Sequence, residues 1–338
     1  TRYTPTNGTT PLRKAVQAKL ARENQLEYAL GQICIANGAK QIIFNAFAAT
    51  LNDGDEVIVP VPYWPTFPDS VRFNGGEAVL LECPLEQEYK LQPQQLAQAI
   101  TDKTRWLVLN NPGNPSGAVY NAAELTALAA VLRDHPNLWI MLDELYEHIL
   151  FDGREHVSLL QVAPDLAERI LLVGGVSKTY AMTGWRIGFG AGPQALIDAM
   201  VVVQSQNSSG ASAISQAAAV AALNGGLDFL PPQRAAYQDR RDAIMAQLSP
   251  VEGIEVLNPE GAFFIFCRCA GLLGKSRADG RKLESEQDVL NYLLESGVSG
   301  VAGSAYGLSP YFRLSIATDI ESVREAGKRI AAACAALK

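Results

Sequence analysis

Short apolar runs alternate with amphipathic segments through the first two thirds of the chain, and this alternation limits the possible folds more than any other feature. The apolar runs are VIVPV, AVLL, WLVL, LWIML and ILLV. Segments with helical periodicity, such as QQLAQAI and AAELTALAAVLRDH, lie between them. Strands that alternate with helices predict an α/β fold with a mostly parallel sheet. Near-continuous apolar runs are typical of strands covered on both faces, so we expect helices to sandwich the sheet.

The pattern changes after about residue 225. A long charged segment, LDFLPPQRAAYQDRRDAIMAQL, predicts a helix. It is followed by AFFIFCRC, by a helical segment around EQDVLNYLLESG, by YFRLSIA and by a final Ala-rich helix. We therefore predict two domains: a large one over residues 1–230 and a smaller C-terminal α+β domain over residues 231–338.

Charge and cysteine content narrow the class of partner and the compartment. The net charge of −7 disfavours nucleic acid as a partner. The five cysteines are odd in number and scattered, which disfavours a disulfide framework and favours a reducing, cytoplasmic location. The three histidines lack metal-binding spacing, so no metal is predicted, and no apolar run is long enough to span a membrane. The chain begins at Thr1 rather than Met, so a preceding segment is compatible with the sequence.

Polar and aromatic side chains follow four of the predicted strands. They are Asn110, Asn111 and Asn114 after WLVL, Asp143 after WIML, Lys178 after ILLV, and Trp64 after VIVPVPY. Each has an ordinary explanation when taken alone: Asp143 could cap a helix, NPGNPSG could be a turn, and a lysine at a strand end is usually solvated. The carboxyl ends of parallel strands converge on a ligand crevice, however, so their joint occurrence indicates a chemical site.

Common nucleotide and hydrolase motifs do not account for these residues. SKT at 177–179 fails as the end of a phosphate-binding P-loop, because Leu172 and Ser177 stand where that motif has glycines. GFGAG at 188–192 does not match the dinucleotide fingerprint, and no GxSxG motif is present.

A lysine that forms a Schiff base fits better. Pyridoxal phosphate needs such a lysine, a carboxylate beside its pyridine nitrogen and an anion site for its phosphate. Lys178 and Asp143 can meet the first two needs, and Arg186 can pair with the phosphate. The helix that opens at NGAK can add backbone N–H groups and a positive helix end.

These motifs together resemble those of the class I/II, fold-type I, pyridoxal phosphate-dependent aminotransferases. The chain is most similar to the bacterial aspartate aminotransferases of the Iβ kind. The resemblance runs from YTPTNGTTPLR to YFRLSIAT and rests on GAKQ, NNPGNPSG, DELYEH and SKTYAMTGWRIGF. It implies a homodimer with shared active sites, in which an amino group passes between an L-amino acid and a 2-oxo acid by a ping-pong mechanism.

The resemblance also implies roles for individual residues. Lys178, Asp143 and Tyr146 would be catalytic. Lys178 would form the Schiff base, Asp143 would pair with the pyridine nitrogen, and Tyr146 would hydrogen-bond the ring's phenolic oxygen. The expected cofactor-binding residues are Gly38, Ala39, Lys40, Trp64, Asn114, Asp143, Tyr146, Ser177, Lys178, Arg186 and, from the neighbouring subunit, Tyr3. The expected substrate-binding residues are Arg313, Asn114, Trp64 and Lys40, with Arg313 on the α-carboxylate.

Some features leave alternatives open. Lys40 can meet a distal carboxylate, which favours aspartate or glutamate with 2-oxoglutarate, but it could equally point to solvent. Aromatic or broad-specificity aminotransferases, a pyridoxal phosphate-dependent β-lyase and an aminotransferase-like sensor domain of a transcription regulator are the alternatives. Gly175 stands where many relatives have a hydroxyl residue, and Ala302 stands where they usually have proline. Relatives also have a further N-terminal segment, which closes over the substrate.

Overall fold

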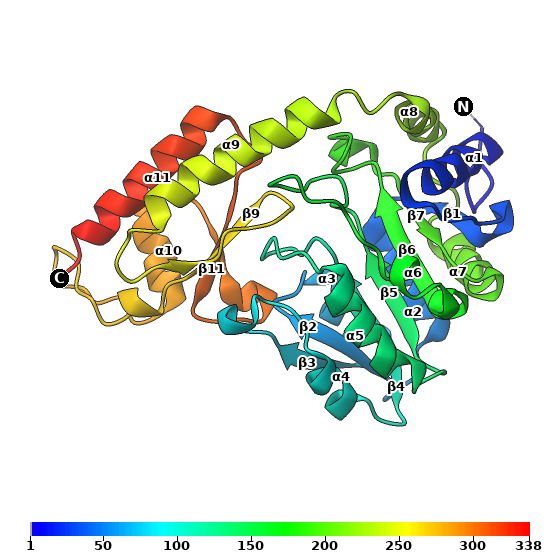
Figure 1. Ribbon diagram of the computed structural model, residues 1–338, viewed down its shortest axis with the longest axis horizontal. Helices are drawn as coiled ribbons and strands as arrows, with labels where there is room; N and C mark the ends of the chain where they lie inside the picture. The colour runs from blue at the N-terminus through cyan, green and yellow to red at the C-terminus, as the bar shows by residue number, and fades with distance from the viewer. Residues whose placement is uncertain (1) are drawn as a thin grey trace.

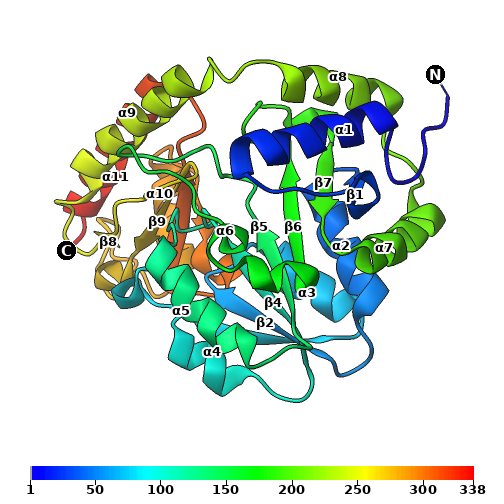
Figure 2. The same ribbon diagram turned by 45° about the vertical axis from the view of Figure 1, so that its right-hand side comes forward.

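The computed structural model describes residues 2–338 and contains two β-sheets, each with its own helices (Figures 1 and 2). The strands of the larger sheet are β1 (Ile33–Ala36), β2 (Glu56–Val61), β3 (Glu77–Glu82), β4 (Thr104–Asn110), β5 (Trp139–Asp143), β6 (Ile170–Gly175) and β7 (Gly188–Ala191). Their order is β1-β7-β6-β5-β4-β2-β3. The pairs from β3 to β6 are parallel, whereas β7 is antiparallel to both neighbours. The expected mostly parallel sheet is confirmed.

Helices cover both faces of this sheet, as the apolar strands predict. They are α1 (Thr10–Lys19), α2 (Ala39–Thr50), α3 (Thr66–Phe73), α4 (Pro93–Ala99), α5 (Ala122–Arg133), α6 (Leu159–Val162), α7 (Gln194–Asn207) and α8 (Ala213–Asn224). One core forms between the sheet and α1, α4, α5, α6 and α8, and a second forms against α2, α3 and α7. The strand β1 shows how both are built, because Ile33 and Ile35 enter the first core while Cys34 and Ala36 enter the second.

The second sheet has four short strands and a separate core. Its elements are α9 (Leu230–Leu248), β8 (Glu255–Val256), β9 (Phe264–Arg268), α10 (Glu286–Glu295), β10 (Val301–Ala302), β11 (Tyr311–Ser315) and α11 (Ile320–Ala335). The strand order is β10-β11-β9-β8, and every pair is antiparallel. In Figure 1 the long helix α9 runs from the larger sheet towards the smaller one, and α11 lies along it. The apolar faces of α9, α10 and α11 close the core of the smaller sheet.

The first helix departs from the regular pattern that its sequence predicts. Helical periodicity continues through residues 11–25, but α1 ends at Lys19 and the chain continues as a wider π-helical turn over Leu20–Asn24. Lys19 and Asn24 are both buried, and both donate hydrogen bonds to the carboxylate of Glu147. The wider turn allows the two side chains to reach the same carboxylate.

No helix within residues 2–338 combines the length and the apolar character that a membrane crossing requires. Cys34, Cys83, Cys267, Cys269 and Cys334 are all buried free thiols.

Candidate active site

The pairing of β4, β5 and β6 brings the predicted strand-end residues to one edge of the sheet. Asn110 lies opposite Asp143 in the register of β4 and β5, and Asp143 lies opposite Val173 in β6. Lys178 lies in the loop between β6 and β7. These residues line a cavity of about 270 Å³, and its full lining is Trp64, Asn110, Asn114, Asp143, Leu145, Tyr146, Lys178, Phe263, Phe264 and Arg313. The structure therefore brings six of the predicted site residues together in one cavity.

The amino group of Lys178 lies among aromatic rings rather than beside a carboxylate. Its Nζ is 5.7 Å from the ring centre of Tyr146 and 5.6 Å from that of Phe263. Burial lowers the pKa of Lys178, and the nearby cations Arg186 and Arg313 lower it further against the opposing effect of Asp143. A lowered pKa increases the unprotonated fraction of the amine, which is the nucleophilic form.

Asp143 is a buried carboxylate that has few partners of its own. One carboxylate oxygen accepts a hydrogen bond from the backbone N–H of Leu145 at 3.2 Å. Burial raises the pKa of Asp143 to about 7, and the adjacent charge of Glu144 acts in the same direction, although Lys178 opposes it. Lys178 is therefore too weak a partner to hold the pKa of Asp143 at its ordinary value.

Arg313 reaches the cavity from the smaller sheet. Its guanidinium carbon lies 4.3 Å from the ring centre of Phe264 and 4.9 Å from that of Tyr306, so aromatic faces hold it in place. Nη1 donates a hydrogen bond to Oδ1 of Asn114 at 2.9 Å, while the buried Nε has no hydrogen-bond partner among residues 2–338. Burial lowers the pKa of Arg313. The arrangement leaves a half-buried cation with donors available for an anionic ligand.

Three segments pack closely together: the start of α2, the loop that follows β6, and the strand β7. We call the hollow between them the cradle. Gly38 precedes α2 with φ of 88°, and a Cβ there would lie 2.4 Å from Nη2 of Arg186. A Cβ on Gly188 would lie 2.2 Å from the backbone nitrogen of Ala39. Arg186 donates hydrogen bonds to the carbonyl oxygens of Thr183 and Asn37, which hold its guanidinium beside the helix start. Backbone N–H groups at a helix start and a fixed guanidinium together suit a phosphate.

The remaining predicted residues lie around these two regions. Ser177 is buried directly before Lys178, and Tyr146 is buried with its ring edge-to-face against Phe264. Burial, followed by the charge of Asp143, raises the pKa of Tyr146. Lys40 projects over the ring of Trp64, with Nζ 4.9 Å from the ring centre. Lys40 itself is exposed and lines a neighbouring hollow with Asn37, Gln41 and Arg186 rather than the cavity.

Tyr3 does not join this cavity within one chain. It is fully exposed and lines a separate surface hollow with Arg2, Ser212, Ala213, Ile214 and Ala217. A role in a neighbouring subunit's site, which the resemblance implies, stays a prediction.

Phe263 and Phe264 also belong to the site, although the sequence alone does not indicate it. Both line the cavity, and Phe264 is the first residue of β9. The segment AFFIFCRC is typical of an ordinary buried strand. Its two adjacent phenylalanines do not indicate that one end of the strand faces a cavity at the edge of the other sheet. Asn110 and Leu145 also line the cavity without having been assigned a role in it.

Comparison with known proteins identifies the family to which the chain belongs. The family model described as "Aminotransferase class I and II" matches residues 1–330. An aspartate aminotransferase from Rhizobium meliloti strain 1021 is 50% identical over 335 residues, which cover 99% of this chain and 82% of that protein. An aspartate/prephenate aminotransferase from Cereibacter sphaeroides is 47% identical over 338 residues, which cover 100% of this chain and 84% of that protein.

A solved structure gives the same result for the fold. The crystal structure of the aspartate aminotransferase from Rhizobium meliloti superimposes with a TM-score of 0.97 at 49% identity. The match covers 100% of this chain and 85% of that one. A family model that spans nearly the whole sequence and a fold that matches over its full length lead to one conclusion: this chain is an aminotransferase and belongs to class I and II, with the type I fold.

Proposed function

We propose that the cavity and the adjoining cradle hold pyridoxal phosphate. The observation that carries this proposal is that Lys178, Asp143 and Arg313, which come from distant parts of the sequence, line one cavity. The buried carboxylate of Asp143, whose pKa is raised to about 7, lacks a strong cationic partner, and a protonated pyridine nitrogen would supply one. The cradle between Gly38 and Arg186 leaves no room for a Cβ, which fits close approach of a phosphate to the backbone.

Each group around the cavity then has a defined task. Pyridoxal phosphate supplies an electron sink that no protein side chain offers. Asp143 pairs with the ring nitrogen, and Tyr146 and Asn114 donate hydrogen bonds to the phenolic oxygen. Trp64 stacks on the ring. The phosphate is held by Gly38, Ala39, Lys40, Ser177 and Arg186, with Tyr3 of a neighbouring subunit.

Lys178 carries the proton chemistry. Its lowered pKa favours the free amine, which is a nucleophile when the cofactor binds and a base when the substrate has taken its place. As a base, the Nζ of Lys178 would take the proton from the substrate Cα and deliver it to the cofactor carbon C4', so that the amino group stays on the cofactor when the 2-oxo acid leaves. Arg313 binds the α-carboxylate through the donors that Asn114 leaves free, and so fixes the Cα within reach of Lys178.

Aspartate or glutamate is the proposed amino donor, and 2-oxoglutarate is the proposed acceptor. Two observations support an acidic substrate. The relatives from Rhizobium meliloti and Cereibacter sphaeroides are named for aspartate or for aspartate and prephenate. The exposed Lys40 lies over the ring of Trp64, which lines the cavity, and its ammonium group would reach a distal carboxylate from the neighbouring hollow.

The first test is an absorption spectrum of the protein loaded with pyridoxal phosphate, recorded before and after addition of L-aspartate alone. We expect the band of the lysine-bound cofactor to disappear, a pyridoxamine band to replace it, and 2-oxoglutarate to restore the original spectrum. This alternation is the signature of a ping-pong transfer. A spectrum that aspartate leaves unchanged would remove the acidic-substrate proposal, and release of pyruvate with ammonia would indicate a β-lyase.

A substitution of Lys178 tests the reactive amine itself. Lys178→Ala removes both the nucleophile and the base, so we expect turnover to be lost while the cofactor still binds through its phosphate and ring contacts. Lys282→Ala, which removes an exposed lysine of the C-terminal region, serves as the control and should keep full activity. Substantial transamination by Lys178→Ala would contradict the assignment.

The protein is also proposed to act as a homodimer in a reducing, cytoplasmic environment. The exposed side chains of Tyr3 and Ile214 border one surface hollow, which supports a contact with a second subunit. Buried free thiols at all five cysteines support a reducing compartment. Light scattering of the purified protein tests the first point, and a fully active monomer would contradict it.

A further inference from the structure

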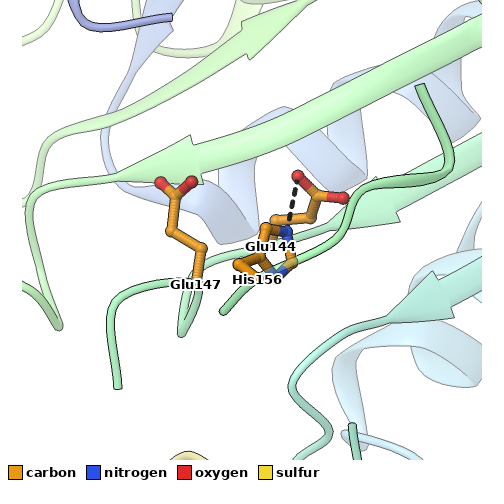
Figure 3. Close-up of side chains that lie close together, drawn as sticks. All are labelled: Glu144, Glu147 and His156. Atoms are coloured by element: carbon orange, nitrogen blue, oxygen red, sulfur yellow. Dashed lines mark ion pairs between the residues drawn. The ribbon is translucent and has the colours of Figure 1, made fainter. Parts of the chain in front are cut away.

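A cluster of buried charged groups lies behind the active site, on the face of β5 opposite the cavity. Asp143 and Glu144 are consecutive residues, and consecutive side chains of an extended chain point to opposite faces. Asp143 lines the cavity, whereas Glu144 is only 3% exposed and forms an ion pair with Nε2 of His156 at 3.2 Å. In Figure 3 the Glu144 carboxylate and the imidazole of His156 lie side by side, joined by the marked ion pair, and the Glu147 carboxylate lies apart from them.

Glu144, Glu147 and His156 are close enough together to be considered as metal ligands. Their donor atoms lie within 4.8 Å of one another. The oxygens of Glu147 are already engaged, however: Oε1 accepts a hydrogen bond from Lys19, and Oε2 accepts one from Asn24 at 2.6 Å. A metal ion here would have two free ligands and a lysine ammonium nearby, so the cluster fits a network of ion pairs better than a metal centre.

The charges of this network depend on His156. The charged groups that act on His156 come from two elements: Lys19 in α1, and Glu144 and Glu147 after β5. Around them, His148 pairs with Glu23 of the π-helical turn, and Tyr28 lies near Glu144. Burial alone would lower the pKa of His156, but Glu144 and then Glu147 outweigh it and raise the pKa. Burial likewise opposes ionisation of Glu147, yet Lys19, His148 and His156 lower its pKa to about 2. Lys19 is the partner of Glu147, which leaves His156 as the partner of Glu144.

We propose that His156 is a positioning residue for the transamination: its imidazolium neutralises Glu144 and so allows Asp143, the next residue along the chain, to carry the negative charge that the cofactor's ring nitrogen requires. Without this cation, Glu144 would be a buried and unpaired carboxylate beside Asp143. Keeping two buried carboxylates ionised at adjacent positions costs more free energy than protonating one of them. The proposal rests on the proposed use of pyridoxal phosphate, but the state of the His156–Glu144 pair can be measured without the cofactor.

The first experiment measures His156 directly. The chain contains only three histidines, so selective ¹⁵N labelling of histidine in the cofactor-free protein gives a spectrum that His→Gln variants can assign. We expect His156 to remain protonated at neutral pH and its titration midpoint to fall in Glu144→Gln. An unchanged midpoint in Glu144→Gln would overturn the proposal. So would a neutral His156 at pH 7, or its binding of added Zn²⁺ at stoichiometric concentration.

The second experiment measures the consequence for the reaction through the pH profile of kcat/KM. In His156→Gln the uncompensated charge of Glu144 disfavours ionised Asp143, so the acidic limb should move to higher pH by on the order of one unit. The double variant Glu144→Gln/His156→Gln removes both charges and should return the limb to the wild-type position. A purely structural role would instead lower activity evenly across pH without rescue by the second substitution.

The two experiments separate the inference from the proposed function. Inactivity towards aspartate with an intact dependence of His156 on Glu144 would remove only the function. An active aspartate enzyme whose pH profile is the same in the wild type and in His156→Gln would remove only the inference. The His135 signal, which belongs to a residue outside the cluster, reports whether each variant is folded.

Discussion

Nη1 of Arg313 donates a hydrogen bond to Oδ1 of Asn114 at 2.9 Å, across 199 positions of sequence. Arg313 belongs to β11 of the smaller sheet, and Asn114 follows β4 of the larger one. The bond therefore fixes Arg313, which reaches the cavity from the smaller sheet, against the residues that surround Lys178. A neutral amide is a suitable partner, because it orients the guanidinium without neutralising it.

Arg313→Lys should weaken substrate use while leaving cofactor binding unchanged. A lysine keeps the charge but loses the planar fork that bonds a carboxylate at two points. A hydrogen bond to a charged group is worth about 1.5–3 kcal/mol, so kcat/KM should fall roughly 10- to 100-fold. Arg268→Lys, in the paired strand β9 and on a surface ion pair with Glu86, is the control and should keep wild-type kcat/KM. Equal effects of the two changes would contradict the role of Arg313.

Gly38→Ala should impair cofactor binding through the cradle. The added Cβ would lie 2.4 Å from Nη2 of Arg186, at a φ of 88° that side chains rarely adopt. Gly54→Ala is a matched control, because Gly54 has a similar φ of 81° but a Cβ there would have no neighbouring atom within 4 Å. Both variants should lose about 1 kcal/mol of stability from the backbone strain. Only Gly38→Ala should also raise the dissociation constant of pyridoxal phosphate, by roughly tenfold or about 1.4 kcal/mol, as measured by fluorescence titration.

Asp143→Asn should change how the stability of the cofactor-free protein depends on pH. Burial raises the pKa of Asp143 to about 7 in the folded chain, above its ordinary value when unfolded. The folded state therefore binds more protons than the unfolded state between these two pKa values. Stability is then greatest below the unfolded pKa and is lost as the pH rises towards 7, by up to about 1.4 kcal/mol per pH unit.

The asparagine variant lacks this contribution. Urea unfolding from pH 4 to pH 8 should show the variant gaining stability relative to the wild type as the pH increases. Bound pyridoxal phosphate should reverse the difference at neutral pH, because the wild-type carboxylate then has a cationic partner. A constant difference between the two proteins across this range would show that Asp143 does not titrate there.

Lys40→Gln should reduce activity on acidic substrates selectively. The ammonium of Lys40 is held over Trp64 at 4.9 Å and would meet the distal carboxylate of aspartate, whereas an aromatic side chain gains nothing from it. We expect kcat/KM for L-aspartate to fall roughly tenfold and that for L-tyrosine to stay the same or rise. Lys14→Gln, which changes a lysine of α1, is the control for loss of charge alone. A parallel loss on both substrates would show that Lys40 acts on the phosphate or on stability rather than on specificity.

The arrangement of the larger sheet was predictable because its strands carry their own signal. The runs around Val57, Leu107, Ile140 and Leu171 are buried on both faces, and each lies in a parallel strand. The site at their ends follows from the same pattern, since parallel neighbours place Asn110 and Asp143 side by side. By contrast, β1 has only four residues, too few to give a pattern that distinguishes a strand from a loop.

Contacts between the two sheets could not be read from the sequence. The position of Arg313 in the site was inferred from resemblance, because an arginine within a strand is otherwise more often part of a structural ion pair. Phe263 and Phe264 were missed for the same reason: their place in the cavity depends on how the smaller sheet meets the larger one. The π-helical turn over Leu20–Asn24 was also hidden, since it depends on Glu147, which lies far away in sequence.

The division of the site between two sheets has a consequence for how the protein matures. The groups of this chain assigned to the cofactor lie between Gly38 and Arg186, in the part that leaves the ribosome first, whereas Arg313 emerges near the end of synthesis. A nascent chain with only the larger sheet formed would already present the proposed cofactor-binding groups but would lack Arg313, the group proposed to bind the α-carboxylate. If Arg313 has its proposed role, the grip on the α-carboxylate is the last part of the site that the growing chain acquires.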